Sequence, residues 1–119
     1  MAVLEFVEVH SLELETNTLL NLSLALVRVG HLDEAAPLHL RLLALGQGES
    51  RRLGAPQFLE MKAHHLIGCA RMIRRDTNGA ALSFRKMLRL AEEGPALETF
   101  WEVGDARLGL QNLREEGFI

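Results

Sequence analysis

Apolar residues recur along this chain of 119 residues at the spacing of helix faces, and two stretches repeat the same order of residue types. The first stretch reads Leu19-x2-Leu22-Ser23-x2-Leu26, a break at Gly30, and then Ala35-x3-His39-x2-Leu42-x2-Leu45. The second reads His64-x2-Ile67-Gly68-x2-Arg71, a break at Arg75, and then Ala80-x3-Phe84-x2-Met87-x2-Leu90. Because positions three and four residues apart share one face of a helix, each stretch predicts two helices joined by a short turn.

The same spacing, together with glycine and proline, predicts the extent of each helix. Apolar residues from Ala2 to Leu12 predict a helix over 2–14, although local alternation of apolar and charged residues there also fits a strand. Further helices are expected over 16–29, 33–45, 56–74, 77–92 and 95–108, and the tail 109–119 has room for a short one. Residues 46–55, rich in glycine and polar groups, predict the main loop. With no long linker, we expect one domain.

Composition supports an all-helical chain and excludes several classes of protein. Hydrophobic residues make up 48% of the sequence, leucine dominates them, and tyrosine is absent; leucine is a strong helix former. A net charge of −3 gives no general attraction to nucleic acid. The single Cys69 excludes an internal disulfide and suits a reducing compartment. Because we find neither a signal peptide nor a long apolar run, we expect a cytoplasmic protein with no membrane insertion.

The order of residues in the two stretches resembles the tetratricopeptide pattern W-x2-L-G-x2-Y…A-x3-F. The resemblance covers about residues 2–108 and implies an all-α fold, a solenoid of antiparallel helix hairpins with five to six helices. It divides the single domain 1–119 into the second helix of a partial repeat (2–14), a repeat (16–45), a repeat with extended spacing (57–92), and a partial repeat or cap (95–119). The interval from Ser23 to Gly68 exceeds that from Gly68 to Gly104, which is similar to the longer repeats of kinesin light chains, cell-polarity adaptors and bacterial transcription regulators.

In tetratricopeptide proteins the first helix of each repeat lines a concave groove that holds a peptide or helix of another protein. The resemblance implies that the partner-binding residues are Leu20, Leu24, Val27, Arg28, Lys62, His65, Cys69, Met72, Trp101 and Asp105. It also points Asn17, Ile73, Glu98 and Leu108 toward the groove. For Leu20, Leu24 and Val27, packing between helices is an equally good interpretation. We therefore expect a non-catalytic scaffold or adaptor that binds a partner protein.

Two other functions fit the same pattern. The chain opens with a helix that lacks its hairpin partner and closes after one first helix, so its ends would bury apolar surface against another copy in a small chaperone or self-associating assembly subunit. Alternatively, it is a regulatory domain of a larger signalling or transcription protein. The clamp that co-chaperones use for acidic C-termini is excluded, because apolar and acidic residues occupy its positions, namely Leu20, Leu24, Leu66, Glu98 and Glu102.

Catalysis and metal binding find little support in the sequence. His65 and Cys69 lie one helical turn apart and would face one metal ion, but a structural zinc needs four ligands and no second cluster supplies the rest. Neither an oxyanion-hole loop nor a phosphate-binding glycine loop is present. Arginines from Arg71 to Arg89 cluster on one hairpin, where a solvated charged face is a better interpretation than RNA binding. We assign no catalytic residue, cofactor or metal.

Overall fold

The computed structural model describes residues 3–47, 56–94 and 100–119, with side chains described from residue 14 onward and from residue 58 in the second segment. These residues form five α-helices and no strand, which confirms the expected all-α class. The helices are α1 (Val3–Arg28), α2 (Leu32–Gln47), α3 (Pro56–Ile73), α4 (Thr77–Glu93) and α5 (Trp101–Glu115). No helix in these segments is long and apolar enough to cross a membrane.

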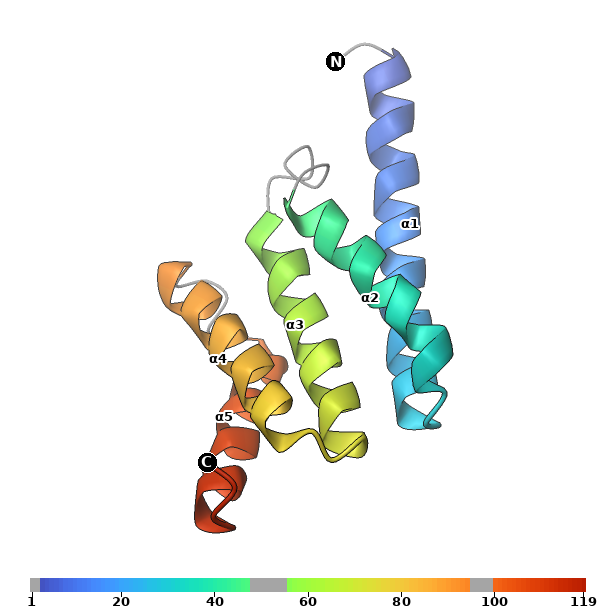
Figure 1. Ribbon diagram of the computed structural model, residues 1–119. Helices are drawn as coiled ribbons and strands as arrows, with labels where there is room; N and C mark the ends of the chain where they lie inside the picture. The colour runs from blue at the N-terminus through green and yellow to red at the C-terminus, as the bar shows by residue number, and fades with distance from the viewer. Residues whose placement is uncertain (1–2, 48–55, 95–99) are drawn as a thin grey trace.

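The helices form two hairpins, α1–α2 and α3–α4, followed by α5 (Figure 1). Each helix packs against the next, and α3 additionally contacts both α1 and α5. The helices α1, α3 and α5, which we call the first helices, thereby form one layer, and α2 and α4 form the other. This is a helix-hairpin solenoid in which α3 is the central element.

One continuous helix, α1, replaces the two helices that we expected over 2–14 and 16–29, so the predicted break is wrong. The sequence from Val3 to Arg28 contains neither glycine nor proline, and Thr16, next to the predicted break, is a buried helical residue. Glu15 accepts two hydrogen bonds from the Arg41 guanidinium of α2, at 2.8 and 3.1 Å. This pairing ties the middle of α1 to its neighbour.

The helix α5 is also longer than predicted, because it runs through Gly109 to Glu115 instead of ending at residue 108. Its apolar face continues with the buried Leu110 and Leu113. Gly109 lies against the Phe84 ring, and a Cβ there would be 3.1 Å from it. The expected separate helix in the tail is therefore part of α5, while the predicted start at 95–99 lies outside the described residues.

Helix α2 continues two residues into the predicted loop, so that Gly46 is helical and buried. A Cβ at this position would lie 2.7 Å from the backbone nitrogen of Glu60, at the start of α3. The glycine thus allows the end of α2 to cross α3 at backbone contact distance. The remainder of the predicted loop, 48–55, lies outside the described residues.

The first helices α1, α3 and α5 all end in the same left-handed cap. The residues with positive φ are Gly30 (81°), Arg75 (62°) and Gly117 (81°). In each case the next amide donates a hydrogen bond to a carbonyl five residues back, in the pairs His31–Leu26 (2.9 Å), Asp76–Arg71 (2.8 Å) and Phe118–Leu113 (2.9 Å). This pattern satisfies carbonyls at the ends of all three helices, and after α1 and α3 it leads into the turn to the next helix.

Three clusters of buried side chains hold the layers together. The largest joins α3, α4 and α5 and contains Met61, Ala80, Ala81, Phe84, Met87, Ala91, Val103, Ala106, Leu110 and Leu113. A second joins α2 and α3 through Leu42, Leu45, Leu59, Ala63 and Leu66. The smallest contains Val27, Ala35 and Ala70. Because α3 contributes to all three clusters, its position determines how α1 and α5 face each other.

Candidate functional site

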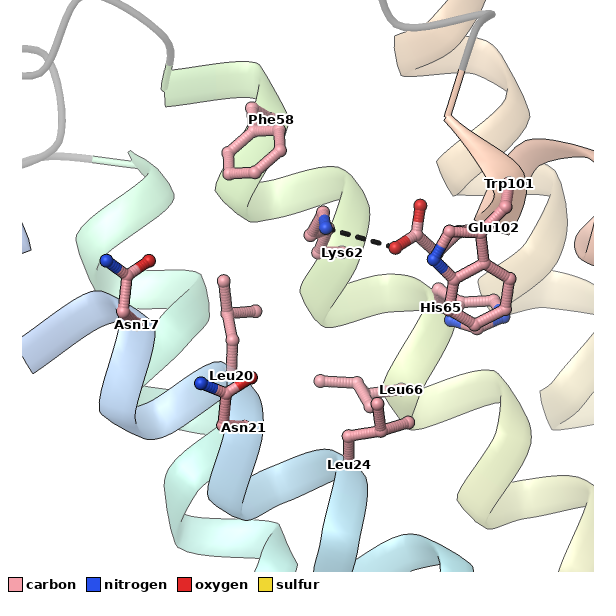
Figure 2. Close-up of a pocket in the computed structure, with 10 residues that line it drawn as sticks. All are labelled: Asn17, Leu20, Asn21, Leu24, Phe58, Lys62, His65, Leu66, Trp101 and Glu102. Carbon is pink, nitrogen blue, oxygen red and sulfur yellow. Dashed lines mark ion pairs between the residues drawn. The ribbon is translucent and has the colours of Figure 1, made fainter.

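A groove of about 310 Å³ lies between the first helices α1, α3 and α5 (Figure 2). Its lining consists of Asn17, Leu20, Asn21, Leu24, Phe58, Lys62, His65, Leu66, Trp101 and Glu102. α1 contributes the first four of these residues, α3 the next four and α5 the last two. We call this surface the α1–α3–α5 groove.

Apolar side chains line much of the groove. Leu20 and Leu24 of α1 are half-buried and pack against the cluster that contains Leu66 of α3. On the other side, Trp101 is 57% exposed. Its indole meets the His65 ring edge to face, with centroids 5.2 Å apart and an interplanar angle of 86°. The groove thus offers leucine side chains on one side and an accessible aromatic ring on the other.

An ion pair lies between α3 and α5 at the groove. The Lys62 ammonium is 3.0 Å from Oε1 of Glu102, and it also lies over the rings of Phe58 (4.8 Å) and Phe100 (5.3 Å). Glu102 is only 4% exposed, and its Oε2 atom has no hydrogen-bond partner in the structure. Since Lys62 compensates the Glu102 charge, this part of the groove has little net charge.

Two side-chain amides stand on the α1 side of the groove. Asn17 and Asn21 are one helical turn apart, and both are exposed (Figure 2). Each amide offers a donor and an acceptor, which are the groups that the backbone of a peptide needs. Together with the leucines, the amides make this wall suited to an amphipathic segment.

Behind Trp101, three side chains from α3 and α5 meet. Nε2 of His65 is 2.7 Å from Oδ2 of Asp105 and 3.5 Å from Sγ of Cys69. Burial, with a smaller contribution from the Asp105 charge, raises the pKa of the Cys69 thiol to about 11. The thiol is therefore protonated at neutral pH.

The sequence-predicted site residues fall into three groups in the structure. Leu20, Leu24, Lys62, His65 and Trp101 all line the groove, as does Asn17. Cys69 and Asp105 contact His65 from outside the lining.

The third group does not reach the groove. Val27 belongs to the core and is 4% exposed, and Met72 packs against the large cluster. Arg28 is exposed in the last turn of α1, beyond the lining residues. Ile73 and Leu108 are exposed elsewhere, and Glu98 lies outside the described residues. Val27 and Arg28 lie in the last turn of α1, and Met72 and Ile73 in the last turn of α3, beyond the residues that line the groove.

The groove also contains residues that we did not assign to partner binding, namely Asn21, Phe58, Leu66 and Glu102. Helical spacing was the signal available for finding them. Asn21 is one turn from Asn17, and Phe58 and Leu66 lie one turn on either side of Lys62.

Neither protein-family models, nor curated proteins, nor solved structures gave a match to this chain. The geometry of the α1–α3–α5 groove is therefore the basis for inferring function.

Proposed function

We propose that this protein is a tetratricopeptide-like, non-catalytic module that binds a peptide or amphipathic helix of a partner protein in the α1–α3–α5 groove. The observation that carries this proposal is the exposure of Trp101 opposite Leu20 and Leu24 across the groove. Tryptophan is enriched among the residues that dominate binding energy at protein interfaces.

The mixture of groups in the groove favours a segment of protein as the occupant. The leucines and Trp101 match apolar side chains that recur along one helix face. Asn17 and Asn21 match polar groups along its edge. Since Lys62 is paired with Glu102, the groove does not favour a strongly acidic peptide. We expect the affinity to depend only weakly on salt, because apolar contact dominates.

A library of displayed helical peptides tests this proposal without knowledge of the natural partner. Trp101 is the only tryptophan, so its fluorescence reports groove occupancy directly. We expect selected peptides to change that fluorescence in the wild type and, by calorimetry, to lose at least about tenfold in affinity for Trp101→Ala, as at other interface tryptophans.

The matched control is Leu82→Ala, which removes an exposed leucine from α4, outside the groove. This variant is expected to bind the peptides as the wild type does. If the selected peptides bind Trp101→Ala as tightly as the wild type, or lose binding with Leu82→Ala, the groove is not the binding site.

Self-association is a second candidate function, favoured by the outer face of α1. Leu14 and Leu22 are exposed there, about two turns apart and so on one side of the helix, and the exposed Val29 directly follows its end. In a solenoid, a preceding helix covers this side of a first helix. Light scattering over a concentration series tests the idea. A dimer that Leu22→Lys converts to a monomer would support it, and a monomer at every concentration would refute it.

A further inference from the structure

Three potential metal ligands of different chemistry meet where α3 contacts α5. From His65, Cys69 and Asp105 we infer a binding site for a divalent transition metal of the zinc class, beside the peptide groove. One donor atom from each residue lies within 4.8 Å of the other two. This inference stands apart from peptide binding, because it needs none of the leucines or asparagines of the groove.

The distances between the three donor atoms fit a bound metal ion once the Asp105 carboxylate moves by a small amount. Ligand atoms at about 2.0–2.3 Å from a tetrahedral zinc lie roughly 3.3–3.8 Å apart. Sγ of Cys69 and Nε2 of His65 are already 3.5 Å apart. Oδ2 of Asp105 is 2.7 Å from the same nitrogen, so it must move outward by less than about 1 Å to exchange its hydrogen bond for a metal bond. The Asp105 side chain is 47% exposed and has room for that movement.

The donor set selects among metals. Imidazole nitrogen and thiolate sulfur suit zinc and cobalt, whereas magnesium and calcium prefer sites built from oxygen alone. Three protein ligands leave a fourth position for water, the arrangement of an open zinc site. His65 and Cys69 occupy one turn of α3, and Asp105 adds the ligand from α5 that was not apparent in the sequence.

Metal binding displaces protons from the ligand atoms. The Cys69 thiol releases its proton to solvent as the metal–sulfur bond forms. The proton that Nε2 of His65 donates to Asp105 must leave this nitrogen for solvent, so that its lone pair binds the metal while Nδ1 carries the ring proton. The hydrogen bond between His65 and Asp105 is lost, and both groups become ligands. The bound metal joins α3 to α5 and holds His65 beneath Trp101.

Titration of the metal-free protein with cobalt(II) tests the site, because cobalt bound to thiolate has an intense charge-transfer band in the near ultraviolet. We expect one cobalt per chain, a thiolate band, and displacement of cobalt by zinc. Cys69→Ser should abolish the band, and Asp105→Asn should weaken cobalt binding by at least about tenfold.

The matched control is His64→Gln, which removes a histidine next to His65 that lies near Glu60, away from the cluster. It should bind cobalt as the wild type does. Cobalt binding that lacks a thiolate band in the folded wild-type protein, or that persists in Cys69→Ser and disappears in His64→Gln, would overturn the proposal. Circular dichroism of each variant verifies its fold.

Discussion

The two hairpins have the same backbone plan but differ at the point where their helices come closest. In α3–α4, the Phe84 ring lies so close to Gly68 that an added Cβ would be 2.5 Å from it. In α1–α2, the corresponding positions of the repeat hold Ser23 and His39. Both are buried, and in the structure neither Oγ of Ser23 nor Nε2 of His39 has a hydrogen-bond partner.

The repeat pattern therefore specifies the backbone geometry of both hairpins, but it does not give them equal stability. An aromatic ring on a glycine buries apolar surface, whereas a buried polar atom without a partner costs free energy. We therefore expect α3–α4, joined to α5 by the largest apolar cluster, to be the more stable hairpin. The α1 wall of the groove then belongs to the less stable part of the molecule, which is common for binding elements.

Truncating Phe84 or His39, the corresponding residues of the two hairpins, should have the largest effect on the free energy of unfolding. Phe84→Ala should lower the free energy of unfolding by about 3–5 kcal/mol. His39→Ala should cost less, because it also removes the buried ring nitrogen that has no partner. Urea denaturation followed by circular dichroism measures both. Equal losses would show that the two contacts are equivalent.

Replacement of glycine by alanine compares a tightly packed position of α3 with the corresponding open position of α5. Gly68→Ala should destabilise the protein by about 1–3 kcal/mol, because the new methyl group meets Phe84. At the corresponding position of α5, Gly104 has open space around it, and Gly104→Ala should raise stability by about 0.5–1 kcal/mol. Thermal unfolding of the two variants distinguishes these signs. A loss for Gly104→Ala would mean that something covers this side of α5.

The pH dependence of stability should also differ between the hairpins. Burial lowers the pKa of His39 below its ordinary value of 6.5, so the unfolded chain binds more protons than the folded one between the two pKa values. Stability is therefore full above about pH 6.5 and falls as the pH decreases through the folded pKa, by at most about 1.4 kcal/mol per pH unit.

His39→Phe copies the second hairpin and should remove this acid sensitivity. Burial lowers the pKa of His64 as well, so a smaller dependence of the same sign should remain. Urea midpoints between pH 8 and 5 provide the measurement. An unchanged pH profile would show that His39 is not responsible.

The smallest expected effect concerns the caps. Arg75 adopts the left-handed conformation that Gly30 and Gly117 adopt at the ends of the other first helices. Arg75→Gly should stabilise the protein by about 0.5–1 kcal/mol, and Gly30→Ala should destabilise it by about 1 kcal/mol. Opposite shifts in melting temperature would confirm the equivalence of the caps, and shifts of one sign would contradict it.

Sequence alone predicted the features that depend on local chemistry. The turn at Gly30 was readable because glycine favours the left-handed cap, and the resemblance to tetratricopeptide proteins implied that Leu20, Lys62 and Trp101 face one surface. The continuity of α1 was missed although its sequence contains neither glycine nor proline, and its pairing through Glu15 with a distant arginine of α2 could not be read from local preferences.

The sequence analysis paired His65 with Cys69 and directed Asp105 toward the same groove, but it did not predict that Asp105 meets this pair. Asp105 is 40 residues from His65, and only the packing of α5 on α3 brings their side chains together. Likewise, the close approach of Gly46 to the backbone of Glu60 is a tertiary contact, which local preferences do not encode.

Amide chemical shifts, recorded as a library-selected peptide is added, test the central claim most directly. Binding in the α1–α3–α5 groove predicts the largest changes around Asn17–Leu24 of α1, Phe58–Leu66 of α3 and the first turn of α5, together with the Trp101 indole. Changes confined to α2 and α4 would contradict the claim, since those helices form the opposite layer.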